Sequence, residues 1–210
     1  MSVKSILSNS VRLSDRFIPD PIELAKTIAT LRECGNTVSM TQGVYDLIHP
    51  GHTRYIERAK SFADVLVVAV DSDEYTRKRK QKANERRPVV PFEERLELLA
   101  NLRTVDILTV RELKEHDEDP MHIIRVVHPD VLVMSRSTAD VGEEWYAKLR
   151  EHCGRLEVLD PQALVTSTSR LRELMMDGAG GLVDCITEAI ENHFQQGGRE
   201  VHFGKKEKKG

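Results

Sequence analysis

The sequence has few of the features that mark membrane, secreted or disulfide-rich proteins. Its 210 residues include only three cysteines, which are odd in number and too widely spaced for a metal-binding pattern: Cys34, Cys153 and Cys185. No apolar run approaches the roughly 20 residues of a membrane-spanning helix, and the first residues lack the apolar stretch of a signal peptide. These absences favour a reducing compartment, and we expect a cytoplasmic protein without a membrane partner.

Charge of one sign is not in excess either. The chain has 31 Lys and Arg against 34 Asp and Glu, a formal net charge of -3. The whole molecule is therefore not a polycation that would attract nucleic acid, and we expect no nucleic-acid partner. Hydrophobic residues make up 40%, an ordinary value for a globular protein. The length fits one large domain, or one domain with extensions.

Strand-like and helix-like stretches alternate from Val38 onward. Runs such as "VLVVAVD" (65–71) and "DVLVMS" (130–135) are apolar throughout, which indicates strands buried on both faces of a parallel sheet. We expect strands at 38–43, 65–71, 106–110, 130–135 and 155–160, and helices at 51–63, 91–102, 119–128, 143–153 and from about 168 and 182. The pattern predicts an α/β fold, a Rossmann-like open parallel sheet of about five strands with helices on both faces, plus N- and C-terminal helical extensions.

The two ends of the chain look like extensions. Residues 1–19 have no clear period and predict a loose arm, followed by a helix that Asp20 caps and Gly35 ends. Its expected apolar face is Ile22, Ala25, Ile28, Ala29 and Leu31. We expect an arm and helix at 1–36, a main domain at 37–177, a C-terminal helix at 178–203 and a disordered tail at 204–210. An apolar stripe on the C-terminal helix would pack on its own domain or on a partner.

The stretch "GVYDLIHPGH" places two histidines at the expected start of a helix. Pro50 suits the first helical turn, and Gly51 and His52 offer backbone N–H groups that favour an anion such as a triphosphate. In the alternative interpretation, His49 is a capping group and His52 a surface residue. A zinc site would need a third ligand, for which Asp46 is available, but Pro-Gly interrupts the regular helix on which such histidines share a face.

Two further stretches suit anions. In "TSTS" (166–169), just before "RLRELM", Ser167 or Thr168 would cap a helix whose N-terminus forms a second anion site; an ordinary cap is the alternative. The segment 76–87 holds seven basic residues and one acid. It predicts a solvated loop that is able to close over substrate phosphates. Arg95 and Arg103, eight residues apart, are expected on one helix and facing one way.

Together these motifs resemble the nucleotidylyltransferase superfamily, in its cytidylyltransferase-like branch, whose signature reads HxGH. The likeness runs from about Leu24 to Met175 and includes "GVYDLIHPGH", "RYIERAKSFADVLVVAVDSDE", "RRPVVPFEERLELLANLRTVD", "PDVLVMS" and "TSTSRLREL". The chain most resembles the adenylyltransferase domain of bacterial heptose-phosphate enzymes, and next glycerol-3-phosphate cytidylyltransferase. The resemblance implies transfer of a nucleotidyl group from ATP or CTP to a phosphorylated small molecule such as a sugar phosphate, with Mg²⁺ on the nucleotide and release of pyrophosphate.

The resemblance also implies roles for individual residues. The catalytic set is His49, His52, Lys80 and Arg103. Nucleotide contacts fall to Gln42, Gly43, Val44, Tyr45, Asp46, Gly51, Arg79, Ser135, Thr166, Ser167, Thr168 and Ser169. Acceptor contacts fall to Asp71, Arg95 and Arg136, with Arg95 also holding helix and loop in place. No side chain is expected to ligate a metal directly, and a homodimer is expected.

Some stretches depart from the family pattern. "SRSTADVGEEW" stands where relatives carry a Gly-Asp type of turn, and "DPQALV" has no basic residue before "TSTS", which disfavours CTP. The base and the acceptor therefore stay open. The alternatives are a glycerol-3-phosphate-type cytidylyltransferase, an FAD synthase-like adenylyltransferase and a nucleotide-binding module without catalysis.

Overall fold

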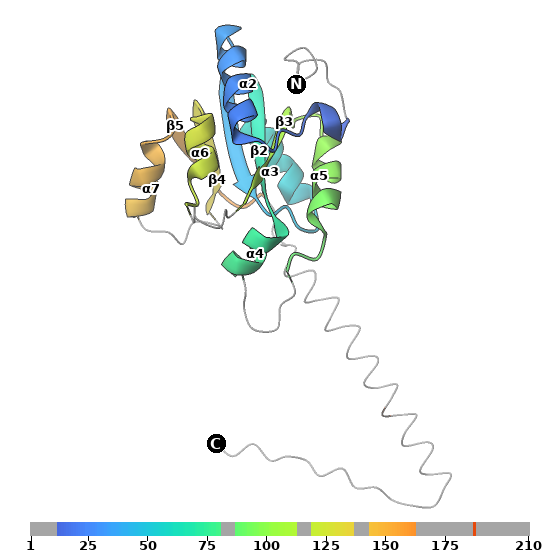
Figure 1. The fold of residues 1–210 in the computed structure, drawn as a ribbon. Helices are drawn as coiled ribbons and strands as arrows, with labels where there is room; N and C mark the ends of the chain where they lie inside the picture. The colour runs from blue at the N-terminus through green and yellow to red at the C-terminus, as the bar shows by residue number, and fades with distance from the viewer. Residues whose placement is uncertain (1–11, 81–86, 113–118, 137–142, 163–186, 188–210) are drawn as a thin grey trace, which may run out of the picture. The chain divides into compact units, whose positions relative to one another are not determined.

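A single parallel sheet organises the described part of the chain (Figure 1). The computed structural model describes residues 12–80, 87–112, 119–136, 143–162 and 187. The chain divides into two compact units, Met1–Leu164 and Val165–Gly210, and only Thr187 of the second unit is described. The sheet order is β3-β2-β1-β4-β5. The strands are β1 Val38–Gly43, β2 Val65–Asp71, β3 Ile107–Arg111, β4 Val131–Ser135 and β5 Arg155–Leu159. The predicted five-stranded parallel α/β sheet is confirmed.

Helices cover both faces of the sheet and close two hydrophobic cores. One core receives α2 (Pro21–Glu33), α6 (His122–Val127) and Leu149 of α7 (Glu143–Arg150). The other receives α3 (Pro50–Lys60), α5 (Phe92–Ala100) and part of the short 3-10 helix η1 (Leu13–Asp15). The predicted helices from about 168 and 182 lie outside the described residues, apart from Thr187, which is helical.

The burial of β2 on both faces of the sheet explains why its apolar run is continuous. Successive side chains of a strand point to opposite faces, so a strand between two helical layers needs apolar residues at every position. Val65, Val67 and Ala69 enter one core, whereas the alternate residues Leu66, Val68 and Val70 enter the other.

The strand order creates a switch point beside β1. The chain runs from β1 to β2 and β3 on one side of the sheet, and then returns to β4 and β5 on the other side. In open α/β sheets ligands bind outside the carboxyl ends of the strands at such a point. By this rule a ligand crevice is expected beyond the carboxyl ends of β1 and β4.

The prediction of a loose arm was wrong for residues 12–19. Phe17 forms a parallel bridge with Leu108 of β3. Ile18 donates its N–H to the Leu108 carbonyl, and Leu108 donates back to the carbonyl of Arg16. Ile18 is buried in the same core as α2. This segment covers the outer edge of β3, and an edge strand of a sheet needs such cover.

The predicted apolar face of α2 was partly wrong. Asp20 caps the helix as expected, accepting from the N–H groups of Ile22 and Glu23. However, Ile22 is 67% exposed, and Ala25 and Ala29 are exposed as well. The buried side chains are Leu24, Thr27, Ile28 and Leu31. The face against the sheet is thus centred on Leu24, Ile28 and Leu31, and Ile22, Ala25 and Ala29 point to solvent.

The basic segment after β2 does not begin as a loop. Helix α4 (Asp73–Lys80) follows β2 almost at once, so residues 76–80 are helical and the predicted loop was wrong there. Residues 81–86 lie outside the described residues. Arginine and lysine therefore stand on a short helix at the carboxyl end of β2, which restricts where they can reach.

Arg103 does not share a helix with Arg95. Helix α5 ends at Ala100, and Arg103 lies exposed in the turn that leads into β3. The buried Arg16 holds this turn by donating to the carbonyls of Leu102 and Val105. Since α5 runs antiparallel to the strands, Arg95 lies at the carboxyl edge of the sheet and Arg103 at the amino edge. The expectation that both face one site was wrong.

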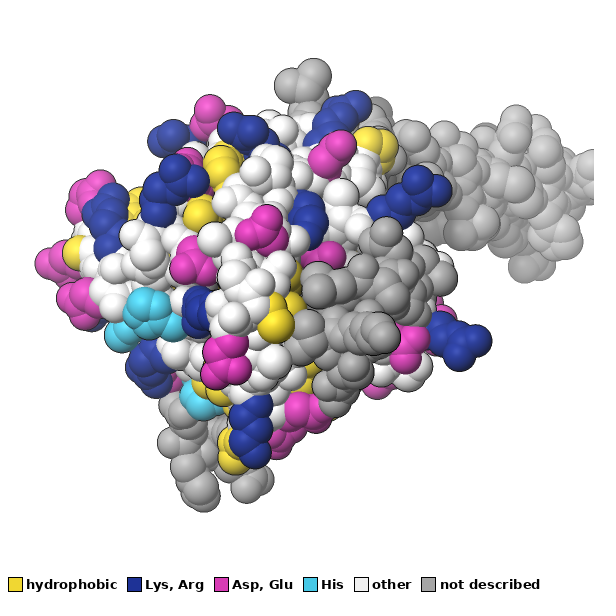
Figure 2. Space-filling view, turned by 90° about the horizontal axis from the view of Figure 1, so that it is seen from above, with side chains coloured by type: hydrophobic (Ala, Val, Ile, Leu, Met, Phe, Trp, Pro, Cys, Tyr) yellow, Lys and Arg dark blue, Asp and Glu magenta, His cyan; other side chains and the backbone are white. Residues whose placement is uncertain are grey.

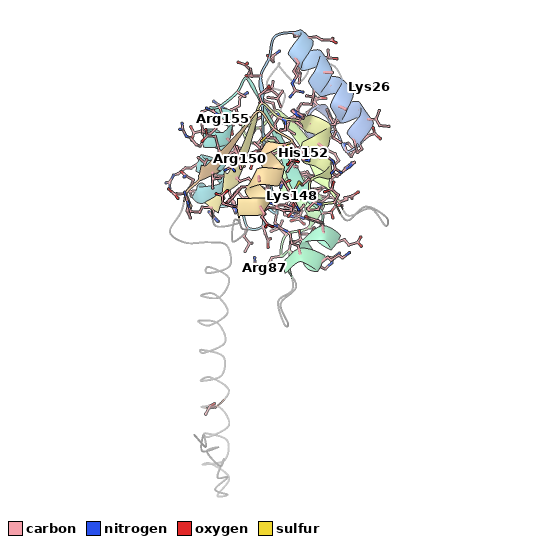
Figure 3. The ribbon with its side chains drawn as sticks, turned by 90° about the vertical axis from the view of Figure 1, so that its left-hand side faces the viewer. Lys26, Arg87, Lys148, Arg150, His152 and Arg155 are labelled. Atoms are coloured by element: carbon pink, nitrogen blue, oxygen red, sulfur yellow. The ribbon has the colours of Figure 1, made fainter. Side chains whose placement is uncertain are left out.

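The surface of the described residues is mixed in charge. On the face in Figure 2, Lys and Arg side chains are interspersed with Asp and Glu. Basic residues also come from α7 and the start of β5, among them Lys148, Arg150 and Arg155 (Figure 3), and His152 stands between Arg150 and Arg155 in the sequence. No helix within the described ranges is both long enough and apolar enough to cross a membrane.

Candidate active site

The loop after β1 is shaped by a tight contact between Gly43 and Tyr45. A Cβ added at Gly43 would lie 3.2 Å from Cε2 of the Tyr45 ring, so a side chain there would crowd the ring. Tyr45 and Leu47 both have left-handed backbones, with φ of 55° and 46°. Gly43 was expected to let another group approach the strand end, and a group that does so is the Tyr45 ring. Tyr45 itself is buried, so its predicted nucleotide contact is not open to its ring in this structure.

His49 and His52 form a stacked pair at the N-terminus of α3; we call them the histidine pair. Their ring centroids are 4.0 Å apart at an interplanar angle of 31°. His49 is the N-cap, and its Nδ1 accepts from the N–H of Gly51 at 3.1 Å. In neutral His49 the proton therefore lies on Nε2. The capping interpretation of His49 is thus correct, and it leaves Nε2 as a hydrogen-bond donor.

The histidine pair lies where an anion is electrostatically favoured. The N-terminus of α3 carries a partial positive charge. His49 already accepts from its first N–H groups, from Gly51 through Nδ1 and from His52 through the backbone carbonyl, so the helix dipole and the imidazoles supply the attraction for an anion. The Tyr45 ring packs edge-on against His52 at 5.7 Å between centroids, which holds the His52 ring from the side. The local structure therefore presents imidazole and helix N-terminus together at the carboxyl edge of the sheet.

Buried hydroxyls tie α3 to both sides of the switch point. The Tyr55 hydroxyl donates to the Val133 carbonyl of β4 at 2.9 Å and lies 2.8 Å from Oγ1 of Thr41 on β1. Tyr45 donates to the same Thr41 oxygen. Neither Thr41 nor Val133 was predicted to be important. The available sequence signal was the polar residues within a buried strand, Ser39, Thr41 and Gln42 of "VSMTQG".

Because Tyr45 and Tyr55 are buried, we expect the free energy of unfolding to fall at alkaline pH. Burial raises the pKa of Tyr45 and of Tyr55 far above the ordinary value near 10. Above about pH 10 the unfolded chain releases these protons while the native chain keeps them. The unfolded state then binds fewer protons, so the free energy of unfolding falls as pH rises, by up to about 1.4 kcal/mol per pH unit for each tyrosine.

Urea denaturation between pH 9 and pH 11 measures this effect. The contribution should be fully present below about pH 10, and Tyr45→Phe or Tyr55→Phe should each make the alkaline decline shallower. A free energy of unfolding that stays level from pH 10 to pH 11 in the unmodified protein would contradict the burial of these hydroxyls.

Asp46 binds the backbone of the segment before α5. Its buried carboxylate accepts from the N–H groups of Val89 and Val90 at 3.0–3.1 Å. These bonds do not test whether Asp46 orients a histidine or contacts the nucleotide, which stays a prediction. They fasten the segment before α5 to the loop after β1. No group of three His, Cys, Asp or Glu side chains suited to a metal ion occurs among the described residues, Asp46 included.

Arg95 joins the same two segments, the loop after β1 and the segment before α5. Its side chain is fully buried, and its guanidinium donates to the carbonyls of Val44, Asp71 and Val90 and pairs with Asp73 at 2.6 Å. The predicted acceptor contact of Arg95 is therefore wrong for this structure, because the guanidinium is enclosed by protein. The expectation that Arg95 holds helix and loop in place is confirmed.

Asp71 is also enclosed. Its side chain has no exposure and forms ion pairs with Arg79 at 2.7 Å and Arg111 at 2.6 Å. A direct contact of Asp71 with an acceptor, as predicted, is not open to it here. Arg111 was missed in the sequence, although a charged residue closing the apolar run "ILTVR" was an available signal.

The other predicted residues fall into four groups. Gln42, Gly51, Ser135 and Arg136 lie at the carboxyl edge, as expected, and Arg136 is exposed and paired with Asp160 at 2.8 Å. Lys80 is the last residue of α4. Arg103 lies at the opposite edge, and Thr166, Ser167, Thr168 and Ser169 lie outside the described residues.

A parallel sheet with an anion-favouring helix N-terminus beside its switch point defines a nucleotide-binding α/β domain. A family model described as Cytidylyltransferase-like matches residues 40–174, more than half of the chain, and the chain belongs to this family. Family membership indicates a nucleotidyltransferase enzyme and confirms the resemblance inferred from the motifs.

Curated relatives match the same region. The bifunctional protein HldE of Alkalilimnicola ehrlichii is 36% identical over 147 residues, which are 70% of this chain and 29% of that protein. The HldE protein of Yersinia enterocolitica is 32% identical over 162 residues, 75% of this chain and 32% of that protein. The chain thus spans about a third of the length of these relatives. Among solved structures, a lipopolysaccharide core biosynthesis protein from Thermoplasma volcanium has 25% identity and a TM-score of 0.49, covering 60% of this chain and 97% of that one.

Proposed function

We propose that this chain transfers an adenylyl group from ATP to the phosphate of a sugar phosphate, such as a heptose phosphate, and releases pyrophosphate. The observation that carries the proposal is the stacked histidine pair at the N-terminus of α3, beside the switch point of the sheet. The resemblance to heptose-phosphate adenylyltransferase domains and the match to HldE proteins support the choice of substrates.

The proposed reaction is an in-line displacement. A phosphate oxygen of the acceptor attacks the α-phosphorus of the nucleotide, and the bond from that phosphorus to the oxygen bridging to the β-phosphorus breaks. Pyrophosphate leaves with the electron pair of that bond. Because the acceptor oxygen is already a nucleophile, the enzyme needs no covalent intermediate. Catalysis then depends on positioning and on charge stabilisation.

The described residues have distinct parts in this proposal. His49, through Nε2, and His52 donate hydrogen bonds to the triphosphate, and the N-terminus of α3 adds its partial charge. Arg79, on α4 beyond the end of β2, is proposed to offset charge on the phosphate of the acceptor, although the resemblance assigned it to the nucleotide. Lys80 and residues 166–169 are proposed as further phosphate contacts, and Arg103 is no longer part of the set. A homodimer remains part of the proposal.

Mg²⁺ belongs to the proposal through its affinity for phosphate oxygens. It is bound in such sites by few protein ligands and by several phosphate and water oxygens. When bound, the ion would neutralise charge on the leaving pyrophosphate.

Two measurements test the proposal. In a thermal-shift assay with Mg²⁺, ATP should raise the melting temperature more than CTP, because ligands that bind only the native state stabilise it. In a pyrophosphate-release assay with ATP, turnover should require a sugar phosphate and should stop with EDTA; omitting the acceptor is the control.

Other outcomes point to other functions. A larger shift with CTP and turnover with glycerol 3-phosphate would replace the proposal by a cytidylyltransferase. Consumption of FMN would indicate an FAD synthase-like enzyme. Tight nucleotide binding without pyrophosphate release for any acceptor would indicate a module without catalysis.

A further inference from the structure

A buried carboxylate at the carboxyl ends of β2 and β3 is shared by two arginines. Arg111 approaches Oδ1 of Asp71 with both Nε, at 2.7 Å, and Nη2, at 2.6 Å. Arg79 approaches Oδ2 with Nη2 at 2.7 Å. Asp71 has no exposed side-chain surface. One negative charge therefore faces two positive charges, and the cluster keeps one positive charge in excess.

The two arginines differ in exposure. The side chain of Arg111 is 8% exposed, whereas that of Arg79 is 31% exposed. Both guanidinium groups lie over the ring of Tyr75, Arg111 at 4.6 Å and Arg79 at 5.7 Å from its centroid. A partly exposed ion pair is held weakly compared with a buried, two-point one. Arg79 is thus the arginine that can exchange its partner for an external anion, while Arg111 stays on Asp71.

The cluster lies next to the loop that carries the histidine pair. One nitrogen of Arg95, Nη1, donates both to the Asp71 carbonyl and to the Val44 carbonyl of that loop. Arg79 lies on α4, beyond the end of β2, whereas the crevice expected at the switch point would lie between β1 and β4. If the nucleotide binds in this crevice, the space beyond the carboxyl end of β2 is available to the acceptor.

We propose that Arg111 is a positioning residue: by neutralising Asp71 it leaves Arg79 free to bind the phosphate of the acceptor. The inference rests on the proposed function for the identity of that phosphate. Without Arg111, Arg79 becomes the sole counterion of a buried carboxylate, and releasing it to a substrate would leave that charge unpaired. Arg79 would then be held away from the acceptor.

Steady-state kinetics on four variants test this relation: Arg79→Gln, Arg111→Gln, the double variant, and Arg77→Gln as an exposed arginine of the same helix. Each of the first two should raise the acceptor KM about tenfold or more, the effect of losing one charge-assisted hydrogen bond, with the ATP KM changed less than about twofold. In the double variant the effects should not add, because Arg111 acts through Arg79. Arg77→Gln should match the unmodified protein.

Several results would overturn the inference. These are an unchanged acceptor KM in Arg111→Gln, equal rises in the KM for ATP and acceptor, or additive effects in the double variant. Melting temperatures establish folding. If Arg111→Gln is unfolded, Arg111→Lys, which keeps the charge but not the two-point contact, should raise the acceptor KM by a smaller factor, and an unchanged KM there counts equally against the inference.

A binding measurement separates this inference from the proposed reaction. Inorganic phosphate, titrated by ³¹P NMR in a buffer free of other anions, should bind more weakly to Arg79→Gln and to Arg111→Gln by the same factor. If the unmodified protein releases no pyrophosphate with any sugar phosphate, the proposed function fails, yet this titration still decides the inference. Equal phosphate affinity in Arg111→Gln and the unmodified protein would refute it.

Discussion

Replacing His52 by alanine is expected to lower kcat/KM for ATP at least about a hundredfold while the chain stays folded. A donor aimed at charge that develops in the transition state contributes on this scale when it is removed. The His52 ring is held between His49, at 4.0 Å, and the edge of Tyr45, at 5.7 Å, so it is fixed before the substrate arrives. A pyrophosphate-release assay gives the rate, and circular dichroism and the melting temperature report folding.

His49 allows capping and catalysis to be separated. Alanine at this position removes the N-cap of α3, which typically costs about 1 kcal/mol, and also removes the imidazole donor. Asparagine is a good N-cap but has no imidazole. We therefore expect His49→Asn to retain the melting temperature and lose most of the turnover, whereas His49→Ala should lose both.

His152 provides the matched control for the histidine variants. It lies in the turn just past the end of α7, near Lys148 and Arg150 (Figure 3), and α7 contributes nothing to the histidine pair. His152→Ala should keep the rate of the unmodified protein. A His52→Ala variant with near-normal turnover would remove the mechanism proposed for this site.

Replacing Arg95 by methionine is expected to lower the free energy of unfolding by at least about 3 kcal/mol and to abolish turnover. Removing one partner from a buried, bonded charge network costs this much because the remaining groups are left unsatisfied. The carbonyls of Val44 and Asp71 and the Asp73 carboxylate all lose their donor. The loop that carries the histidine pair would then lose its attachment to α5.

Urea denaturation measures the change, with Arg77→Met on α4 as an exposed control that should shift stability little. Arg95→Lys keeps the charge, but one ammonium cannot reach every acceptor of the guanidinium. The free energy of unfolding of Arg95→Lys should therefore lie between that of Arg95→Met and that of the unmodified protein. An Arg95→Met variant with the stability of the unmodified protein would show that these bonds contribute nothing net.

The strands and helices could be predicted because their signal is local. A run such as "VLVVAVD" reports burial on both faces without reference to any other segment, and all five expected strands were found. The helix start at Pro50 followed from Pro-Gly and the flanking histidines in the same way. Three predictions were wrong where the structure depends on what packs against a segment. They concern the buried face of α2, the ordered segment at Arg16–Ile18 and the helix at 73–80.

The amino-acid sequence by itself determined the α/β class, the parallel sheet, the family and the placement of two histidines at a helix N-terminus. Periodicity, capping residues and motif spacing act within a few residues, so they can be seen in the chain alone. Only the tertiary structure decided which arginines serve the site. Arg95 meets a carbonyl 51 residues away and Arg111 a carboxylate 40 residues away, while Arg103 was carried to the opposite edge. Such partners are brought together by the crossing of the chain between strands, which sequence spacing does not report.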